Sequence, residues 1–296
     1  MNGGFREVWE RAKALVFHKF GLQESKRPKM PQRKLFQSFE IYLPADHKLT
    51  KYQTQHPNYD RFLPHLAKYL DNLDLVVDVG ANVGDTLAAM YEANPNLRYI
   101  CVEPDDEFYI FLSENIARIK SAGNRIEVET YQALVGHAVS HASLHGVGGT
   151  KHAVPGQGVP SVPLDALIRK ADRASVRLLK TDVDGYDFDV LDSARTLISL
   201  SKPLIYFEAQ YETKAQLNGY LATLASLEAR GYSNWSVFDN FGSLMLQTSN
   251  LSHLSQLMSY IWVQNIEKST RTIYYLDVLA ARDEDRVFVE KVLETY

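Results

Sequence analysis

Apolar strands and helices alternate along the middle of this 296-residue chain, and this alternation constrains the fold more than any other feature. Strands that alternate with helices form a mostly parallel sheet with helices on both faces. The sequence therefore predicts a doubly wound α/β fold with a seven-stranded sheet. The predicted strands lie at residues 75–79, 98–103, 126–134, 176–182, 204–208, 235–247 (interrupted at 240–242) and 272–280, and the main helices at 59–70, 85–93, 106–122, 188–198 and 213–230.

Basic residues are concentrated at the start of the chain. Residues 1–34 hold nine Lys and Arg against three Glu, a charge of +6, which leaves −10 for the remainder of a chain whose total is −4. Apolar side chains at helical spacing predict an amphipathic helix at residues 5–20, followed by a linker at 21–33. Such a basic arm can contact an anionic membrane surface; a solvated leader is the alternative. We therefore divide the chain into an N-terminal segment, 1–58, and a main domain, 59–296.

Composition excludes several classes of protein. The single cysteine, Cys101, cannot form an internal disulfide and fits a reducing compartment. No apolar run is long enough to cross a bilayer, and the N-terminus lacks the pattern of a secretory signal. We expect a cytoplasmic protein that becomes peripheral at the inner membrane surface if residues 5–34 bind lipid. The acidic main domain argues against a nucleic-acid partner, and the sequence predicts no particular oligomeric state.

The first predicted strand ends in VVDVGANVGD, a pattern typical of a ligand-binding turn. Gly80 and Gly84 allow the backbone to turn tightly and to approach a ligand. A dinucleotide site requires Gly-x-Gly-x-x-Gly, whereas Asn82 stands at the second glycine position. Asp78 precedes the turn; a carboxylate there opposes a diphosphate but suits the cationic methionine end of S-adenosylmethionine (SAM). The pattern therefore favours SAM over a nicotinamide dinucleotide.

The ends of the next two strands supply further cofactor contacts. Glu103 lies 25 residues after Asp78, at the tip of the second strand. An acid in that place accepts hydrogen bonds from both ribose hydroxyls of a nucleoside, and SAM contains the same ribose. Gln132 and Ala133, at the end of the third strand, are placed to touch the adenine.

The ends of the fourth and fifth strands carry the candidate chemistry. Asp182, Asp184 and Asp187 surround the flexible Gly185, and Glu208 ends the adjacent strand. An alcohol is a weak nucleophile, so methyl transfer needs an aligned oxygen and an acceptor for its proton. We expect Asp182 and Glu208 to face one crevice, one as general base and one holding the substrate. Two alternatives stay open: the carboxylates bind Mg²⁺, or Asp184 or Asp187 caps a helix. No metal ligand is assigned.

A histidine- and glycine-rich segment lies between the third and fourth strands. His137, His141 and His145 recur every four residues, and His152 follows. On a helix the first three would share a face and could bind zinc. The surrounding valines and glycines favour strands and turns instead, and hence a substrate-binding loop.

Taken in order, these motifs resemble the FkbM family of SAM-dependent methyltransferases. The resemblance rests on DVGANVGD, VEPD, VPLDAL, LLKTDVDGYDFDVLDSA and IYFEAQ, and it covers residues 59–281. The sequence departs from the family pattern at Asp184, where the family usually has the longer Glu. The resemblance implies a class I, Rossmann-like methyltransferase domain. It implies a cofactor site made by Asp78, Gly80, Ala81, Asn82, Gly84, Glu103, Gln132 and Ala133, and catalytic residues Asp182, Asp184 and Glu208.

The resemblance also implies an acceptor class. Members of the family methylate hydroxyl oxygens of sugars or of macrolides, and the segment at residues 41–70 is similar to members associated with bacterial surface-polysaccharide synthesis. We expect SAM-dependent O-methylation of a glycan hydroxyl. The alternatives are a polyketide or lipid hydroxyl, and a partner protein that binds SAM without catalysis.

Overall fold

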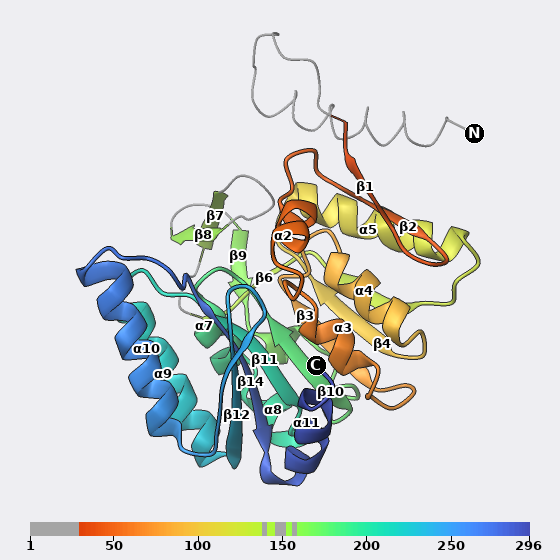
Figure 1. The fold of residues 1–296 in the computed structure, drawn as a ribbon. Helices are drawn as coiled ribbons and strands as arrows, with labels where there is room; N and C mark the ends of the chain where they lie inside the picture. Colours follow the sequence, from red (N-terminus) through yellow and green to blue (C-terminus); the bar gives the residue numbers. More distant parts are fainter. Residues whose placement is uncertain (1–29, 138–140, 146–151, 156–158) are drawn as a thin grey trace, which may run out of the picture.

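The structure is a computed structural model that describes residues 30–137, 141–145, 152–155 and 159–296. The amphipathic helix predicted at residues 5–20 lies outside this part of the chain. Within it, an eight-stranded sheet forms the centre of the molecule, in the order β13-β12-β14-β11-β10-β3-β4-β5 (Figure 1). The strands are β3 Leu75–Val79, β4 Arg98–Val102, β5 Glu127–Tyr131, β10 Val176–Thr181, β11 Leu204–Ala209, β12 Tyr232–Asp239, β13 Leu244–Thr248 and β14 Leu276–Arg282.

The sheet is parallel over most of its width. Strands β5, β4, β3, β10 and β11 pair in parallel, whereas β14, β12 and β13 pair antiparallel at the other edge. The predicted doubly wound α/β fold is therefore confirmed. The eighth strand arises because the interrupted segment predicted at 235–247 forms two strands joined by a turn.

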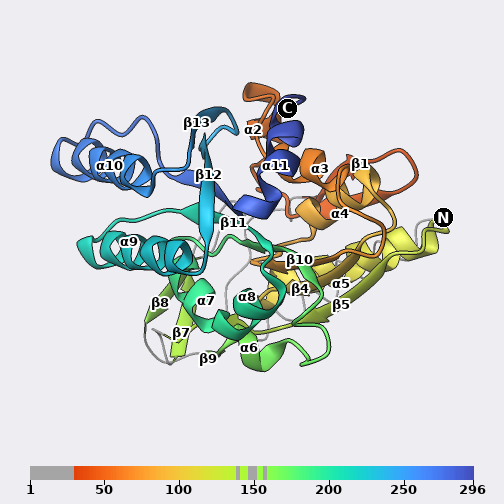
Figure 2. The same cartoon turned by 90° about the horizontal axis from the view of Figure 1, so that it is seen from below.

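Helices cover both faces of the sheet, and each face has its own core (Figure 2). Central strand β3 contributes to both, since Val77 packs on one face and Val76 on the other, and all five of its residues are buried. One face is covered by α3 Phe62–Ala67, α4 Asp85–Ala93, α5 Asp106–Ser121 and α11 Arg286–Leu293. The other is covered by α6 Leu164–Leu167, α7 Asp187–Ser193, α8 Arg195–Ser201, α9 Lys214–Ala229 and α10 Leu251–Trp262.

The lead-in to the main domain is more ordered than the sequence predicts. Strands β1 Gln32–Leu35 and β2 Glu40–Leu43 form a hairpin, followed by α2 Leu49–Gln55. Ile41 and Leu43 are fully buried in the same core as α4. The predicted linker at 21–33 therefore ends earlier than expected, because apolar side chains after it have a core to join.

The last two basic residues of the predicted arm belong to this hairpin. Arg33 pairs with Glu40, and the Lys34 ammonium donates to Gln53 Oε1 at 2.6 Å. Burial lowers the pKa of Lys34, although the charge of Asp85 opposes this shift. Both residues therefore have partners within the domain, and the membrane contact expected for residues 5–34 stays a prediction.

Other differences lie at element ends. The helix predicted at 188–198 is two helices, α7 and α8, that meet at Ala194. Helix α10, the π-helix Val263–Glu267 and the short 3₁₀ helix Asp283–Asp285 were not predicted. The third predicted strand ends at Tyr131. A second, four-stranded sheet follows, in the order β6-β9-β7-β8, from β6 Leu134–Val135, β7 His141–His145, β8 His152–Pro155 and β9 Val159–Val162.

Candidate active site

A cavity of about 470 Å³ opens beyond the carboxyl ends of strands β3, β10 and β11, beside the start of β14. Strands β3 and β10 are neighbours, but the chain proceeds from β3 to β4 on one side and from β10 to β11 on the other. Their loops therefore diverge, which is where ligands bind in open α/β sheets. The cavity is lined by side chains and backbone from residues 47–63, 80–86, 180–184, 206–210, 240–242 and 271–277.

The glycine loop between β3 and α4 forms one wall of this cavity. Gly80 has φ +78°, and a Cβ added there would lie 1.9 Å from the backbone oxygen of Asp182. Only glycine allows the loops after β3 and β10 to touch in this way. Gly80, Ala81 and Asn82 line the cavity, and Gly84 precedes α4 with φ +79°. The predicted turn is therefore present, and it lines the cavity.

Glu103 fixes the glycine loop to the end of β4. Its Oε2 accepts a hydrogen bond from the Asn82 N–H at 2.8 Å, and its Oε1 accepts one from the Asp105 N–H at 2.8 Å. The side chain is 5% exposed, and burial raises its pKa to about 7. Gln132 is exposed and donates to Asp106 Oδ1 at 2.7 Å. Glu103, Gln132 and Ala133 lie at neighbouring strand ends, outside the lining of the cavity.

Asp78 is placed differently from the prediction. Its carboxylate is fully buried, does not line the cavity, and forms an ion pair of 2.8 Å with the Lys180 ammonium. Direct contact with the cationic end of SAM is therefore not supported. A buried charge needs a partner of opposite sign, and Lys180 on the adjacent strand β10 provides it.

Lys180 lines the cavity and was not singled out from the sequence. Its ammonium also donates to the Gly80 carbonyl at 2.9 Å and lies 3.7 Å from Asp182 Oδ2. Burial by itself lowers the pKa of Lys180, but the charges of Asp78 and Asp182 outweigh burial and the net shift is upward. The lysine is therefore charged. A signal existed, because a lysine inside an apolar strand needs a buried acid.

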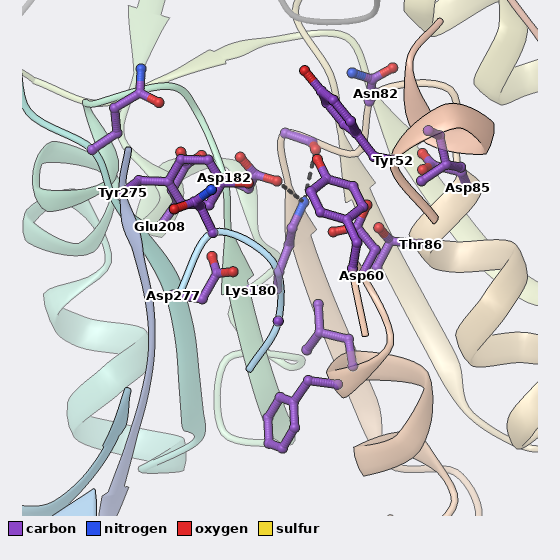
Figure 3. A pocket seen from close by; sticks show the side chains of 18 of the residues that line it. Tyr52, Asp60, Asn82, Asp85, Thr86, Lys180, Asp182, Glu208, Tyr275 and Asp277 are labelled. Carbon is purple, nitrogen blue, oxygen red and sulfur yellow. Dashed lines mark hydrogen bonds and ion pairs between the residues drawn. The ribbon is translucent and has the colours of Figure 1, made fainter. Parts of the chain in front are cut away.

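Asp182 and Glu208 face the same crevice, as the sequence predicts (Figure 3). The Asp182 side chain is 52% exposed, whereas Glu208 is 5% exposed, and the two are hydrogen-bonded. Burial, followed by the charges of Asp182 and Asp184, raises the pKa of Glu208 well above its usual value. Glu208 therefore carries the shared proton and donates it toward Asp182.

The other two aspartates of the cluster have different environments. Asp184 lines the cavity at φ +52°, and burial together with the charge of Asp182 raises its pKa to about 7. Asp187, in contrast, is fully buried at the start of α7. It accepts hydrogen bonds from the Thr181 hydroxyl at 3.0 Å and the Tyr220 hydroxyl at 3.2 Å. The expectation that Asp187 lies at the cavity mouth is wrong; it is an internal acceptor.

The cavity holds further acids and tyrosines that sequence reasoning missed. Tyr206, Asp277, Tyr59 and Tyr275 all line it. Burial raises the pKa of Asp277 well above its usual value, whereas Asp60, which also lines the cavity, is exposed. Asp277 carried a signal, because it interrupts an apolar strand and antiparallel β14 begins where β11 ends. Asp60 carried none, since it follows a polar turn.

Neither metal alternative gains support from the geometry. Among the described residues, no three His, Cys, Asp or Glu side chains are grouped to hold a metal ion. His141 and His145 lie on strand β7, with His145 paired in register with His152 on β8. The shared helical face required for the zinc interpretation therefore does not form.

The sequence profile of the methyltransferase FkbM domain matches residues 78–233, more than half of the chain. This chain belongs to the FkbM methyltransferase family. The predicted family is thereby confirmed. The match begins at Asp78 and includes the glycine loop, Glu103, Asp182 and Glu208. The walls at residues 47–63, 240–242 and 271–277 lie outside it.

Solved structures are similar to this FkbM methyltransferase at low identity. Methyltransferase FkbM from Methylobacillus flagellatus KT is 22% identical over 46% of this chain and 33% of that chain, with a TM-score of 0.35. The present chain thus spans about a third of that protein. A precorrin-6y C5,15-methyltransferase from Geobacter metallireducens is 14% identical over 74% and 86%, with a TM-score of 0.38. A SAM-dependent methyltransferase from Agrobacterium tumefaciens is 8% identical over 88% and 72%, with a TM-score of 0.47.

No curated protein matches the sequence of this FkbM methyltransferase. In the described part of the chain, no helix combines the length and the apolar character needed to span a bilayer.

Proposed function

We propose that this FkbM methyltransferase transfers the methyl group of SAM to a hydroxyl group of a glycan bound in the cavity. The observation that carries the proposal is the Asp182–Glu208 pair, which lines the cavity beside the glycine loop. A cofactor loop and a proton acceptor on one crevice are what transfer to a hydroxyl requires.

The residues present fit SAM. Gly80, Ala81 and Asn82 of the glycine loop line the cavity, and the N-terminus of α4 directly follows this loop. A helix N-terminus favours the negative charge of the methionine carboxylate. Glu103 uses one lone pair of each carboxylate oxygen within the protein, and a carboxylate has further acceptor sites for ribose hydroxyls. The sulfonium of bound SAM supplies an electrophilic methyl group.

Asp182 and Glu208 take different roles. Asp182 is half exposed to the cavity, so its carboxylate can accept the proton of an acceptor hydroxyl. Glu208 is buried with a raised pKa, and it holds Asp182 in place through its hydrogen bond. Asp184 lines the same crevice and is available to hold another hydroxyl. The shorter side chain at 184 is compatible with this role because the residue already faces the cavity.

The wall chemistry supports a polyhydroxyl acceptor. Carboxylates of Asp60 and Asp277 accept hydrogen bonds from hydroxyls, and the rings of Tyr52 and Tyr59 provide flat apolar surface beside them. An acceptor made mostly of hydrocarbon would leave these carboxyl groups without partners. The glycan therefore suits the cavity better than a lipid or polyketide chain.

Calorimetry and variants test the proposal. We expect SAM to bind with a dissociation constant in the micromolar range, about −8 kcal/mol. Asp182→Asn should retain SAM binding and lower turnover about 10²–10⁴-fold, measured as S-adenosylhomocysteine formed with a panel of methyl glycosides. The control is Asp283→Asn, an exposed aspartate outside the cavity, which should behave like the wild type.

Each failure has its own meaning. Nicotinamide dinucleotide binding without SAM binding would contradict the whole proposal. SAM binding without turnover on any glycoside would favour the non-catalytic partner, and turnover on long-chain alcohols alone would favour the lipid acceptor. Activity that is lost with EDTA and restored with Mg²⁺ would assign the acidification of the hydroxyl to a metal.

A further inference from the structure

One cation lies at the junction of the glycine loop and the catalytic pair. The Lys180 ammonium is 2.8 Å from Asp78 Oδ1, 2.9 Å from the Gly80 carbonyl oxygen and 3.7 Å from Asp182 Oδ2. Its side chain is 4% exposed, so the surroundings screen its charge poorly. Asp78 alone would suffice as its ion-pair partner, yet the ammonium also reaches toward Asp182 (Figure 3).

We propose that Lys180 is a positioning residue that stabilises the negative charge of Asp182 and aligns this carboxylate with the glycine loop. The proposal rests on the role of Asp182 in the proposed function. Asp182 is held from two directions, by the ammonium of Lys180 on its own strand and by the hydrogen bond of Glu208 on strand β11. Through the Gly80 carbonyl, the same ammonium fixes the loop expected to hold the cofactor.

The charges around Asp182 show why a cation is needed. In Figure 3, Asp182, Glu208 and Asp277 lie on one side of Lys180, and Asp60 and Asp85 lie on the other. Negative charge at Asp182 is opposed by these neighbours, and Lys180 offsets the repulsion. The acidic groups that interact with Asp182 or Lys180 are Asp60, Asp78, Asp85, Asp184, Asp187, Glu208 and Asp277, with Tyr59, Cys101 and Glu103 also near.

A test must separate this role from the simple neutralisation of Asp78. Replacing Lys180 alone would leave a fully buried carboxylate without a partner, which unfolds many proteins. The double variant Asp78→Asn/Lys180→Gln removes both buried charges and leaves two amides that can hydrogen-bond. The Asp182→Asn variant identifies the resonance of Asp182 in spectra of protein labelled with ¹³Cγ-aspartate.

The primary measurement needs no acceptor. We expect the ¹³Cγ resonance of Asp182, read at one fixed pH, to move in the double variant relative to the wild type, because the ammonium 3.7 Å from its Oδ2 is gone. The double variant should unfold cooperatively and should bind S-adenosylhomocysteine. Turnover on any glycoside that the wild type methylates should fall.

A second measurement uses the unaltered protein, so that a misfolded variant does not decide the matter. The ¹⁵Nζ resonance of Lys180 should shift at the pH at which Asp182 changes its charge, and this shift should be absent in Asp182→Asn. The proposal would be overturned if the ¹³Cγ resonance of Asp182 were unchanged in a folded double variant. It would also be overturned if the ¹⁵Nζ resonance of Lys180 behaved in the same way in the wild type and in Asp182→Asn.

Failure of the proposed function gives a different pattern. If Asp182→Asn turns over substrate at the wild-type rate, Asp182 is not the proton acceptor, whatever Lys180 does to its charge. If Asp182→Asn is inactive while the double variant keeps both the Asp182 signal and full turnover, only the role of Lys180 is contradicted.

Discussion

At the scale of the residue, Gly80 joins the loop after β3 to the loop after β10. Its missing Cβ is the reason that the backbone oxygen of Asp182 can approach the loop after β3, and its φ of +78° strains any other residue. The same contact fixes the position of the Asp182 backbone. One residue therefore influences both the glycine loop and Asp182.

We expect Gly80→Ala to lower the free energy of unfolding by roughly 3 kcal/mol or more, because left-handed strain and a backbone clash add. The control is Gly123→Ala, which shares a left-handed φ of +87° but has no atom within 4 Å of the added Cβ. That variant should lose about 1–2 kcal/mol. Urea unfolding with equal losses in both variants would show that the Gly80–Asp182 contact is not tight.

Individual residues also mark the limit of sequence reasoning about the site. Glu208 and Asp182 could be assigned to one crevice because strand ends that carry acids meet at a switch point. The burial of Asp78 was missed because its partner Lys180 lies 102 positions away in the sequence, and the one signal was that a lysine inside an apolar strand needs a buried acid. Asp187 followed the same strand end, but the start of α7 turned its side chain inward.

At the scale of the element, strands and helices were predicted correctly where the hydrophobic pattern was strong and where turn residues such as glycine marked both ends. Strand Leu75–Val79 and helix Asp85–Ala93 have the predicted bounds, because an apolar run ends in a glycine turn and the helix follows at once. Helix α10 was missed although local signals existed, since Asn250 caps its N-terminus and Leu254, Met258 and Ile261 recur at helical spacing. The hairpin β1–β2 was predicted only in part, as one weakly alternating strand at residues 35–43, because its two strands have only four residues each.

The cavity wall contains a joint between three such elements. Tyr296, after α11, donates a hydrogen bond from its hydroxyl to the Gly242 carbonyl at 2.8 Å, and its ring meets Phe62 and Phe238 edge-on. Close by, His56 and Phe241 stack with ring centroids 3.8 Å apart. The joint connects the lead-in, the β12–β13 turn and the end of the described chain.

We expect Tyr296→Phe to lower the free energy of unfolding by about 1 kcal/mol, since it removes a half-buried hydroxyl from its acceptors. Tyr260→Phe is the matched control, because Tyr260 is 59% exposed. Differential scanning calorimetry should place the melting temperature of the first variant below that of the second. Identical melting temperatures would mean that the rings alone hold the joint.

At the scale of the whole molecule, buried acids dominate the dependence of stability on pH. Burial raises the pKa of both Glu103 and Asp187 to about 7 from usual values of 4.5 and 3.8. When the pH lies between the usual pKa of such a carboxyl group and its raised pKa in the folded protein, the group is ionised in the unfolded chain and protonated in the folded protein. Stability is therefore greatest below the unfolded values and declines as the pH rises toward 7.

We expect the melting temperature to be higher at pH 5 than at pH 8, the reverse of a protein whose carboxylates are stabilised by cations. Asp187→Asn should flatten this dependence, because the fully buried carboxyl no longer ionises. Asp283→Asn, exposed on the surface, should leave the slope unchanged. A melting temperature that rises from pH 5 to pH 8 in the wild type would contradict the inward role of these acids.

The basic arm remains a prediction, since residues 5–20 lie outside the described part of the chain. We expect the full chain to sediment with anionic vesicles and to be released as salt rises, at about 1 kcal/mol per basic residue near the surface. The comparison is a shortened chain that starts at Met30, which keeps the hairpin beginning at Gln32 intact. Equal sedimentation of both chains would contradict a lipid contact of the arm.

The divided origin of the cavity has a consequence for protein engineering. Asp182 and Glu208 lie at the ends of the central strands β10 and β11, whereas most of the remaining wall belongs to segments at 47–63, 240–242 and 271–277. If one of these segments were replaced with the matching segment of a relative, its side chains would not fit the two segments that were left in place. Phe62, Phe238 and Tyr296 would then meet foreign partners. A change of acceptor is therefore best sought by exchanging the three segments as a set, with the strands beneath them left untouched.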